Sequence, residues 1–137
     1  MPARQVRILL LFLVCAAAAA TGVYWTRRWH LLKTYRGEQV YPVVCRWANA
    51  TLPKDSIIAG EQVTGAMRYY TDRTFARIDW IEPARFSFLR ARTEARGYRW
   101  YALIIPSESD VLLRNLPGRW QETADFQGFR LFRLDPD

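Results

Sequence analysis

The chain is short of histidine and cysteine, and these shortages exclude two kinds of protein. A single histidine among 137 residues rules out a metal site built from several histidines. Two cysteines are too few for a small fold held together by disulfide bonds. Half of the residues are hydrophobic and 15% are aromatic, which excludes a disordered or collagen-like chain. The length fits one folded domain.

The sequence also lacks the motifs that predict an enzyme. Residues Gly60 to Gly65 do not have the spacing of a dinucleotide-binding glycine loop, and Glu61 would repel a phosphate. A serine hydrolase needs a histidine base beside its nucleophile, and the only histidine, His30, lies just after the apolar N-terminal run. Cys45 is expected to pack as a small hydrophobic side chain. We therefore predict no catalytic residue, no metal site and no cofactor in this chain.

The excess positive charge is confined to the first part of the chain. Residues 1–54 hold eight lysines and arginines and one acid, a net charge of +7. Residues 55–137 hold twelve basic and twelve acidic side chains and are neutral overall. Twelve arginines could still form a basic face of the kind that binds nucleic acid. Cations flanking an apolar run are more typical of attraction to anionic lipid, so the distribution favours membrane lipid over a nucleic-acid partner.

The N-terminal run is long enough to cross a membrane. No charged residue occurs between Ile8 and Trp25, and these 18 residues would extend ~27 Å as a helix, close to the ~30 Å of a hydrocarbon core. Arginines flank the run on both sides, and Tyr24 and Trp25 are suited to the membrane interface. We predict an uncleaved anchor at residues 1–27. The alternative is a cleaved signal peptide with its cleavage site in the alanine tract at 16–20.

The remaining residues predict an α/β fold. Residues 28–54 are expected to form a basic helical connector and residues 55–137 the domain. Continuous apolar runs are typical of strands buried on both faces, and strands that alternate with helices predict a small Rossmann-like three-layer domain with a mostly parallel sheet. A C-terminal antiparallel hairpin is expected at Gln127-Gly128. The predicted helices are 28–36, 40–51, one around 63–70, 83–96 and 108–115, and the predicted strands are 56–60, 75–79, 100–105, 119–126 and 129–134.

One segment, residues 65–80, stands out as a candidate ligand-binding site. Its arginines can hold anions through paired hydrogen bonds, and its aromatic rings can stack on a sugar. The candidate residues are Arg68, Tyr69, Arg73, Arg77 and Trp80. The structural alternative is that Tyr70 belongs to the core and that Arg77 and Asp79 secure the end of a strand.

Several segments together resemble a known family. These are the apolar helix, the basic connector, the run LPKDSIIAGEQVTGAMRYYTDRTFARIDW at 52–80 and the run RGYRWYALI at 96–104. They resemble the C-terminal region of bacterial glycosyltransferases that span the membrane many times and use polyprenyl-phosphate sugars, the relatives of protein O-mannosyltransferases and lipid A aminoarabinose transferases. The resemblance implies a small α/β domain outside the cytoplasm, attached to the inner membrane by one helix.

The chain departs from that family in what it lacks. The family's catalytic acids lie in loops of a long membrane region, which this sequence does not contain, so none of those residues can be carried over. The resemblance implies an accessory or detached tail domain that is not catalytic alone and that works with a multi-spanning membrane protein and a lipid-linked sugar. The alternative is a membrane-anchored interaction module unrelated to glycosylation. Counting the positive charges on either side of the anchor favours a cytoplasmic C-terminus, against the orientation that the resemblance implies.

Overall fold

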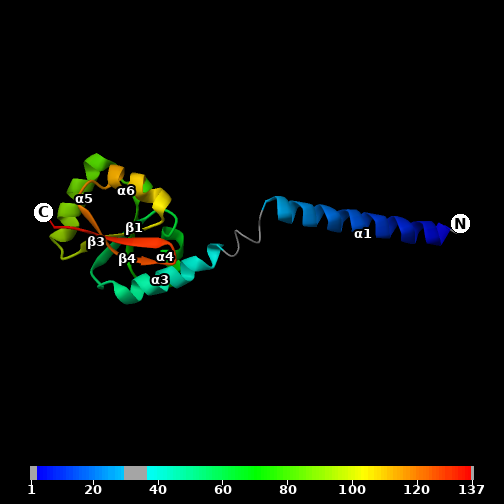
Figure 1. Cartoon of the computed structure of the whole chain (residues 1–137), viewed down its shortest axis with the longest axis horizontal. Coiled ribbons are helices and arrows are strands. Elements are labelled where there is room, and N and C mark those ends of the chain that lie inside the picture. The colour runs from blue at the N-terminus through cyan, green and yellow to red at the C-terminus, as the bar shows by residue number, and fades with distance from the viewer. Residues whose placement is uncertain (1–2, 30–36, 137) are drawn as a thin grey trace. The chain divides into compact units, whose positions relative to one another are not determined.

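The main element described in the first unit is a long helix. The computed structural model describes residues 3–29 and 37–136, which divide into one compact unit at Met1–Gln39 and a second at Val40–Asp137. Helix α1 (Ala3–Arg28) is drawn in blue in Figure 1. Its 26 residues extend about 39 Å. The expected helix at 28–36 falls mainly on 30–36, outside the described residues.

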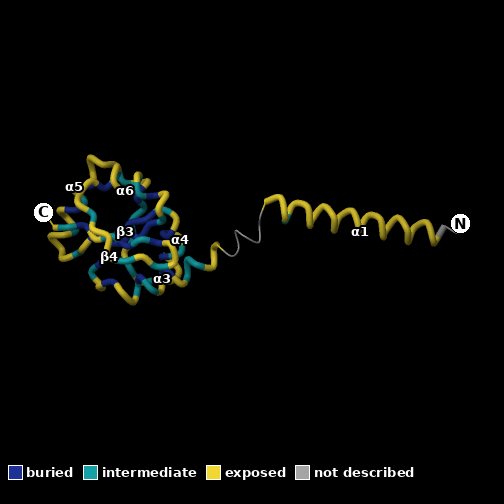
Figure 2. The backbone as a smooth tube through the Cα atoms, in the orientation of Figure 1, coloured by how far each residue is buried: buried dark blue, intermediate teal, exposed yellow. Residues whose placement is uncertain are grey.

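Helix α1 is apolar, and no other described residue of its unit buries its apolar segment. Within the segment Arg4–Arg28, an 18-residue window has a mean hydropathy of 2.3. Every residue from Arg4 to Trp25 is exposed, and the tube of α1 is yellow over these residues in Figure 2. The helix is therefore long and apolar enough to cross a membrane, as predicted. A signal sequence has the same length and composition.

The second unit has the predicted α/β composition around one five-stranded sheet. Helix α3 (Val40–Thr51) precedes the first strand, at the residues that the sequence predicts. Short 3₁₀ turns follow two of the strands. In chain order the other elements are β1 (Ser56–Gly60), α4 (Thr64–Tyr70), β2 (Thr74–Arg77), η1 (Ile78–Trp80), α5 (Pro83–Glu94), β3 (Arg99–Ile104), η2 (Pro106–Glu108), α6 (Ser109–Asn115), β4 (Trp120–Phe126) and β5 (Phe129–Leu134).

The sheet is mixed, and the expected parallel majority is not confirmed. Its strand order is β2-β1-β3-β5-β4. Strand β1 pairs in parallel with β2 and β3, whereas β5 pairs antiparallel with both β3 and β4. The apolar strand β5 takes the inner place beside β3, and β4, with exposed polar residues in its middle, forms the edge. Two of the four pairings are therefore antiparallel.

The hairpin joining β4 and β5 forms where it was predicted. Gln127 has φ 56° and Gly128 has φ 81°, and two successive residues of positive φ make a tight turn whose twist matches the two strands. The pairing begins with Phe126 opposite Phe129 and shifts register between Glu122 and Ala124. The turn therefore forces the antiparallel pairing that makes the sheet mixed.

Apolar residues collect on both sides of the sheet. Along β3, Tyr101 and Leu103 belong to one buried cluster, and Trp100, Ala102 and Ile104 belong to the other. This alternation explains why β3 reads as a continuous apolar run. Helices α3 and α4 contribute to the first cluster, and α5 and α6 contribute to the second. Figure 2 shows β3 in dark blue within the domain.

Two local predictions differ from the structure. Strand β2 ends at Arg77 instead of residue 79, because Ile78 turns into the core and its carbonyl oxygen accepts a hydrogen bond from Asn115 Nδ2 at 2.8 Å. The helix expected from residue 108 begins one residue later, because Glu108 ends the turn η2 and α6 starts at Ser109.

Candidate functional site

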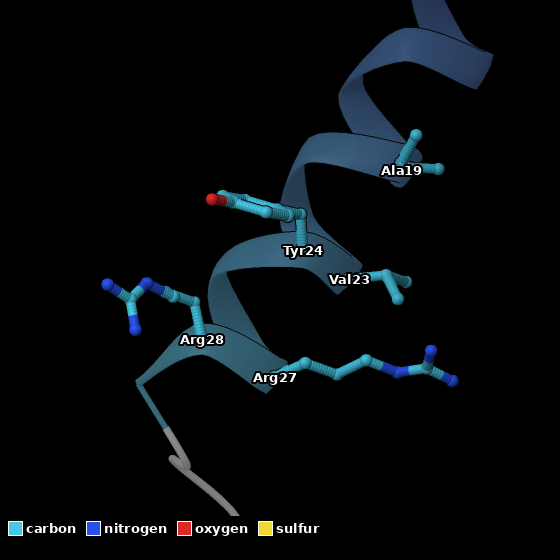
Figure 3. Close-up of a pocket in the computed structure, with 6 residues that line it drawn as sticks. Ala19, Val23, Tyr24, Arg27 and Arg28 are labelled. Carbon is cyan, nitrogen blue, oxygen red and sulfur yellow. The ribbon is translucent and has the colours of Figure 1, made fainter.

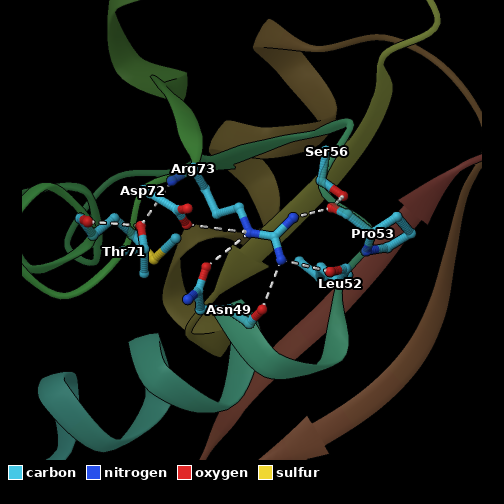
Figure 4. Close-up of polar contacts among 8 residues, drawn as sticks. Asn49, Leu52, Pro53, Ser56, Thr71, Asp72 and Arg73 are labelled. Atoms are coloured by element: carbon cyan, nitrogen blue, oxygen red, sulfur yellow. Dashed lines mark hydrogen bonds and ion pairs between the residues drawn. The ribbon is translucent and has the colours of Figure 1, made fainter.

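The five predicted ligand-binding residues do not form one cluster. Arg68 and Tyr69 are exposed on α4. Arg73 precedes β2 and points toward the end of α3 (Figure 4). Arg77 and Trp80 lie together at the end of β2 and in η1. The structure thus brings together one pair of the predicted residues.

Arg73 has a structural role, because its side chain is bonded to the backbone at the end of α3. Its side chain is 8% exposed. Nε donates to Asn49 Oδ1 at 2.7 Å, and Nη2 donates to the carbonyl oxygens of Asn49 at 2.7 Å and Leu52 at 2.8 Å. Nη1 donates to the carbonyl oxygen of Pro53 (Figure 4). The guanidinium therefore satisfies carbonyl groups that the end of α3 leaves unpaired, and it is already saturated with partners.

Arg77 has a different environment, between a carboxylate and an indole ring. Its Nε and Nη2 donate to the two carboxylate oxygens of Asp79 at 2.9 and 2.6 Å. The guanidinium carbon lies 4.7 Å from the centre of the Trp80 ring, which is cation–π distance. The hydrogen bond from Arg77 is the main reason why the pKa of Asp79 is lowered and that of Arg77 raised. We call Arg77, Asp79 and Trp80 the Trp80 platform.

The Trp80 platform is accessible and lies at a favourable edge of the sheet. Trp80 is 76% exposed, so a ligand can reach its ring. Arg77 pairs with Gly60 where β1 and β2 both end. The carboxyl ends of parallel strands are where α/β proteins most often bind ligands. The charge of Glu61, the residue after β1, also acts on Arg77.

The sequence analysis missed one unusual group, the buried carboxyl of Glu108. The residue is 3% exposed, and Oε1 accepts a hydrogen bond from the backbone nitrogen of Gln62 at 3.0 Å. Oε2 is buried without a hydrogen-bond partner among the described residues. Burial raises the pKa of this carboxyl. Nothing in the run Pro106-Ser107-Glu108-Ser109 separates it from an exposed glutamate, because burial here depends on η2 meeting the loop after β1.

Tyr70, which the structural alternative assigns to the core, does not belong to it. Tyr70 is 44% exposed, and the guanidinium of Arg46 lies 6.0 Å from its ring centre. Cys45 is fully buried, as expected, and desolvation raises its thiol pKa to about 11. A thiol with so high a pKa is not a nucleophile at neutral pH. Over residues 3–29 and 37–136, no three histidine, cysteine or carboxylate side chains come together as a metal site.

The end of α1 has the side chains of a membrane boundary. Small apolar residues, among them Ala19 and Val23, give way to Tyr24 and then to Arg27 and Arg28. Figure 3 shows the two arginine side chains extending to different sides of the last turn. An aromatic residue followed by cations is typical of the interface between hydrocarbon and water.

Comparison of the chain with protein-family models, curated proteins and solved structures gave no match.

Proposed function

We propose that this chain is a single-pass membrane protein whose α/β domain lies outside the cytoplasm and serves a glycosyltransferase that uses a lipid-linked sugar. The domain is accessory and not catalytic alone. It presents the Trp80 platform to the sugar or to the acceptor, while a multi-spanning partner supplies the chemistry. The family resemblance of residues 52–80 and 96–104 motivates this proposal, with the Rossmann-like three-layer fold that it implies.

The observation that carries the proposal is the exposed indole of Trp80 with the guanidinium of Arg77 against it. An aromatic ring offers an apolar surface to the C–H groups of a sugar. An arginine can donate to hydroxyl or phosphate oxygens in a fixed, planar geometry. The carboxylate of Asp79 holds that arginine in place through two hydrogen bonds. Apolar stacking and directional polar groups side by side are what recognition of a sugar phosphate requires.

Helix α1 supplies the second support. A lipid-linked sugar stays at the membrane, so a domain that handles it must be held there. The apolar surface of α1 is exposed along its length and requires lipid or another helix to cover it. An uncleaved α1 keeps the domain at the membrane surface.

Binding of a lipid-linked sugar tests this proposal. The full chain in detergent micelles is titrated with polyprenyl-phosphate-linked mannose and, separately, with free mannose and inorganic phosphate. Binding is measured by isothermal titration calorimetry, which needs no reporter group and applies equally to the wild-type chain and to each variant. We expect Trp80→Ala to weaken binding of the lipid-linked sugar about tenfold, the equivalent of about 1.4 kcal/mol.

Phe88→Ala is the matched control, because Phe88 is another aromatic residue exposed on the same domain, at 69%. It should leave sugar binding unchanged. If Trp80→Ala and Arg77→Ala bind the lipid-linked sugar as tightly as the wild-type chain does, the Trp80 platform is not the binding site. If the tagged chain co-purifies with no multi-spanning membrane protein, the accessory role is contradicted.

A groove favours a second candidate, an anchored interaction module. Trp80, Ile81, Phe88 and Leu89 line a groove of about 520 Å³ at the start of α5. Two large aromatic residues exposed beside one groove are typical of a surface that meets another protein. In this case Trp80→Ala and Phe88→Ala would both abolish capture of the partner, and neither would affect the binding of a sugar.

A further inference from the structure

Glu108 occupies a position that disfavours its charge. The side chain ends the short turn η2 and is buried at 3% exposure. Oε1 accepts a hydrogen bond from the Gln62 nitrogen at 3.0 Å, and the other oxygen has no hydrogen-bond partner within residues 3–29 and 37–136. Buried polar atoms are nearly always hydrogen-bonded, so an unpartnered one calls for an explanation. The energetic penalty of that oxygen is larger when the carboxyl is charged.

The hydrogen bond at Glu108 is one link in a chain that reaches α3. Gln62 donates its backbone N–H to Glu108, and its side-chain oxygen accepts from the Tyr41 hydroxyl at 2.8 Å. The Tyr41 ring lies edge-on against Phe129, with ring centres 5.5 Å apart. The chain of contacts therefore connects η2, the loop after β1, the start of α3 and the first residue of β5.

The charges around Glu108 oppose its ionisation. Glu61, in the same loop as Gln62, is a like charge that acts on it. Arg77, at the end of β2, acts on Glu61 and is bonded to Asp79. Asp110, on the first turn of α6, is also negative, but it is exposed and its charge is screened by solvent. Backbone amides stabilise the ionised form, but burial is the larger effect and the pKa of Glu108 is raised.

We propose that Glu108 is a proton-operated latch, which fastens the loop after β1 and the start of α3 to η2 when its carboxyl is neutral and releases them when it ionises. This inference goes beyond the proposed function, because it concerns the attachment of α3 and does not depend on any sugar. Helix α3 is the first element of the second unit, which begins at Val40. The latch would therefore make the start of the domain sensitive to the pH of its compartment.

The sign of the pH effect follows from linkage. In the open state the carboxyl is in water and its pKa is about 4.3. In the closed state its pKa is higher, so the latch is fully effective below the open-state pKa and is lost as the pH rises through the closed-state pKa. Between these two pKa values the ratio of open to closed molecules rises about tenfold for each pH unit.

Amide hydrogen exchange of the full chain in detergent micelles tests the latch. Protection of the Gln62 amide and of residues 40–48 is measured from about pH 4 to about pH 8, around and above the ordinary glutamate pKa, and is corrected for intrinsic exchange. We expect protection at Gln62 to fall about tenfold per pH unit until the closed-state pKa is passed. Wild-type protection that does not change with pH would overturn the proposal.

Three variants separate the latch from general acid or base sensitivity. Glu108→Gln keeps an oxygen that can accept from Gln62 but cannot ionise, so its protection should not vary with pH and should exceed the wild-type value at neutral pH. Glu61→Gln removes the like charge, so its protection should level off at a lower pH than in the wild type. Asp110→Asn removes an exposed charge two residues away and should reproduce the wild-type curve.

Each outcome decides the question. A Glu108→Gln protein that keeps the wild-type pH slope contradicts the latch. Where Glu108→Gln does not fold, Glu61→Gln decides, because a curve identical to the wild type shows that Glu108 does not control the exchange.

Discussion

Two arginines four positions apart, Arg73 and Arg77, have different roles that the sequence does not separate. Both stand beside an aspartate and an aromatic residue. Arg73 is buried against three backbone carbonyl oxygens and one side-chain oxygen, whereas Arg77 is held at the surface by Asp79 and Trp80. The first secures α3 to the sheet, and the second is available to a ligand. Only the tertiary position of α3 distinguishes them.

Substitution of Arg73 should destabilise the domain strongly. Arg73→Ala removes the donors to the carbonyl groups of Asn49 and Leu52, whereas the carbonyl of Pro53 still accepts from Ser56 Oγ at 2.6 Å. We expect a loss of roughly 2–4 kcal/mol in the free energy of unfolding, because buried acceptors without partners are costly. Urea unfolding followed by circular dichroism measures it.

Arg68→Ala is the control for Arg73, since Arg68 is exposed on α4. Its effect should stay within about 0.5 kcal/mol. Arg73→Lys should be intermediate, because an ammonium keeps the charge but cannot reproduce the planar set of donors. Equal stability of Arg68→Ala and Arg73→Ala would contradict the role assigned to Arg73.

Asp79 should contribute to stability at neutral pH and lose that contribution in acid. The hydrogen bond from Arg77 lowers its pKa in the folded state, so its contribution is present above the unfolded pKa of about 3.9 and disappears as the pH falls through the folded value. Asp79→Asn should therefore flatten the acid side of the stability curve. Urea midpoints at a series of pH values measure it.

Asp72→Asn is the matched control for Asp79. Asp72 is 85% exposed, and its oxygen lies 3.9 Å from Arg73 Nε. The acid side of its curve should follow the wild type. An acid side in Asp79→Asn as steep as in the wild type would contradict the pairing with Arg77.

At the scale of elements, the strands and helices with strong apolar patterns were predictable. The runs at β1 and β3 and the Gln127-Gly128 turn formed where the sequence indicated. The end of β2 was not predictable, because it depends on the bond from Asn115 on α6, 37 residues away. The position of β5 between β3 and β4 was not predictable either. It depends on which of the two hairpin strands buries more apolar surface in the assembled sheet.

Gly60 is required by the packing of β1 against β3. A Cβ atom at this position would lie 2.8 Å from the carbonyl oxygen of Leu103 and 2.7 Å from Val63 Cγ1. We expect Gly60→Ala to destabilise the domain by about 1–3 kcal/mol through overpacking. The measurement is the shift in the urea unfolding midpoint.

Gly65→Ala is the matched control for Gly60. Gly65 lies in α4, and a Cβ there would meet nothing within 4 Å. The same substitution should raise stability by about 0.5–1 kcal/mol, because alanine favours a helix over glycine. If both variants shift the midpoint in the same direction, the close approach at Gly60 is not the cause.

At the scale of the whole molecule, both buried clusters consist of residues between Val44 and Leu134. We therefore expect residues 40–137 to fold without the apolar helix, with the same thermal midpoint as the domain of the full chain in micelles. Near-ultraviolet circular dichroism measures both. A domain that loses its fixed tertiary structure on removal of residues 1–39 would contradict this expectation.

The candidate site was only partly predictable for the same physical reason. Periodicity indicates which residues face a core, and the apolar runs predicted β1 and β3. It does not show which exposed or buried charges meet across elements, so it grouped Arg73 with Arg77 and passed over Glu108. The pairing of Arg77 with Asp79, which the sequence analysis gave as the structural alternative, could be predicted because the two residues are close in sequence.

The central claim is that α1 anchors the chain with its domain outside the cytoplasm, where lipid-linked sugars are used by the family that the sequence resembles. The charges around the anchor favour the opposite orientation, so a measurement of topology separates the two arguments. A pair of fusions after Asp137, one to alkaline phosphatase and one to a green fluorescent protein, is expressed in a bacterium and fractionated. The account predicts an active phosphatase and a dark fluorescent protein, both in the membrane fraction. A fluorescent fusion with an inactive phosphatase would contradict it.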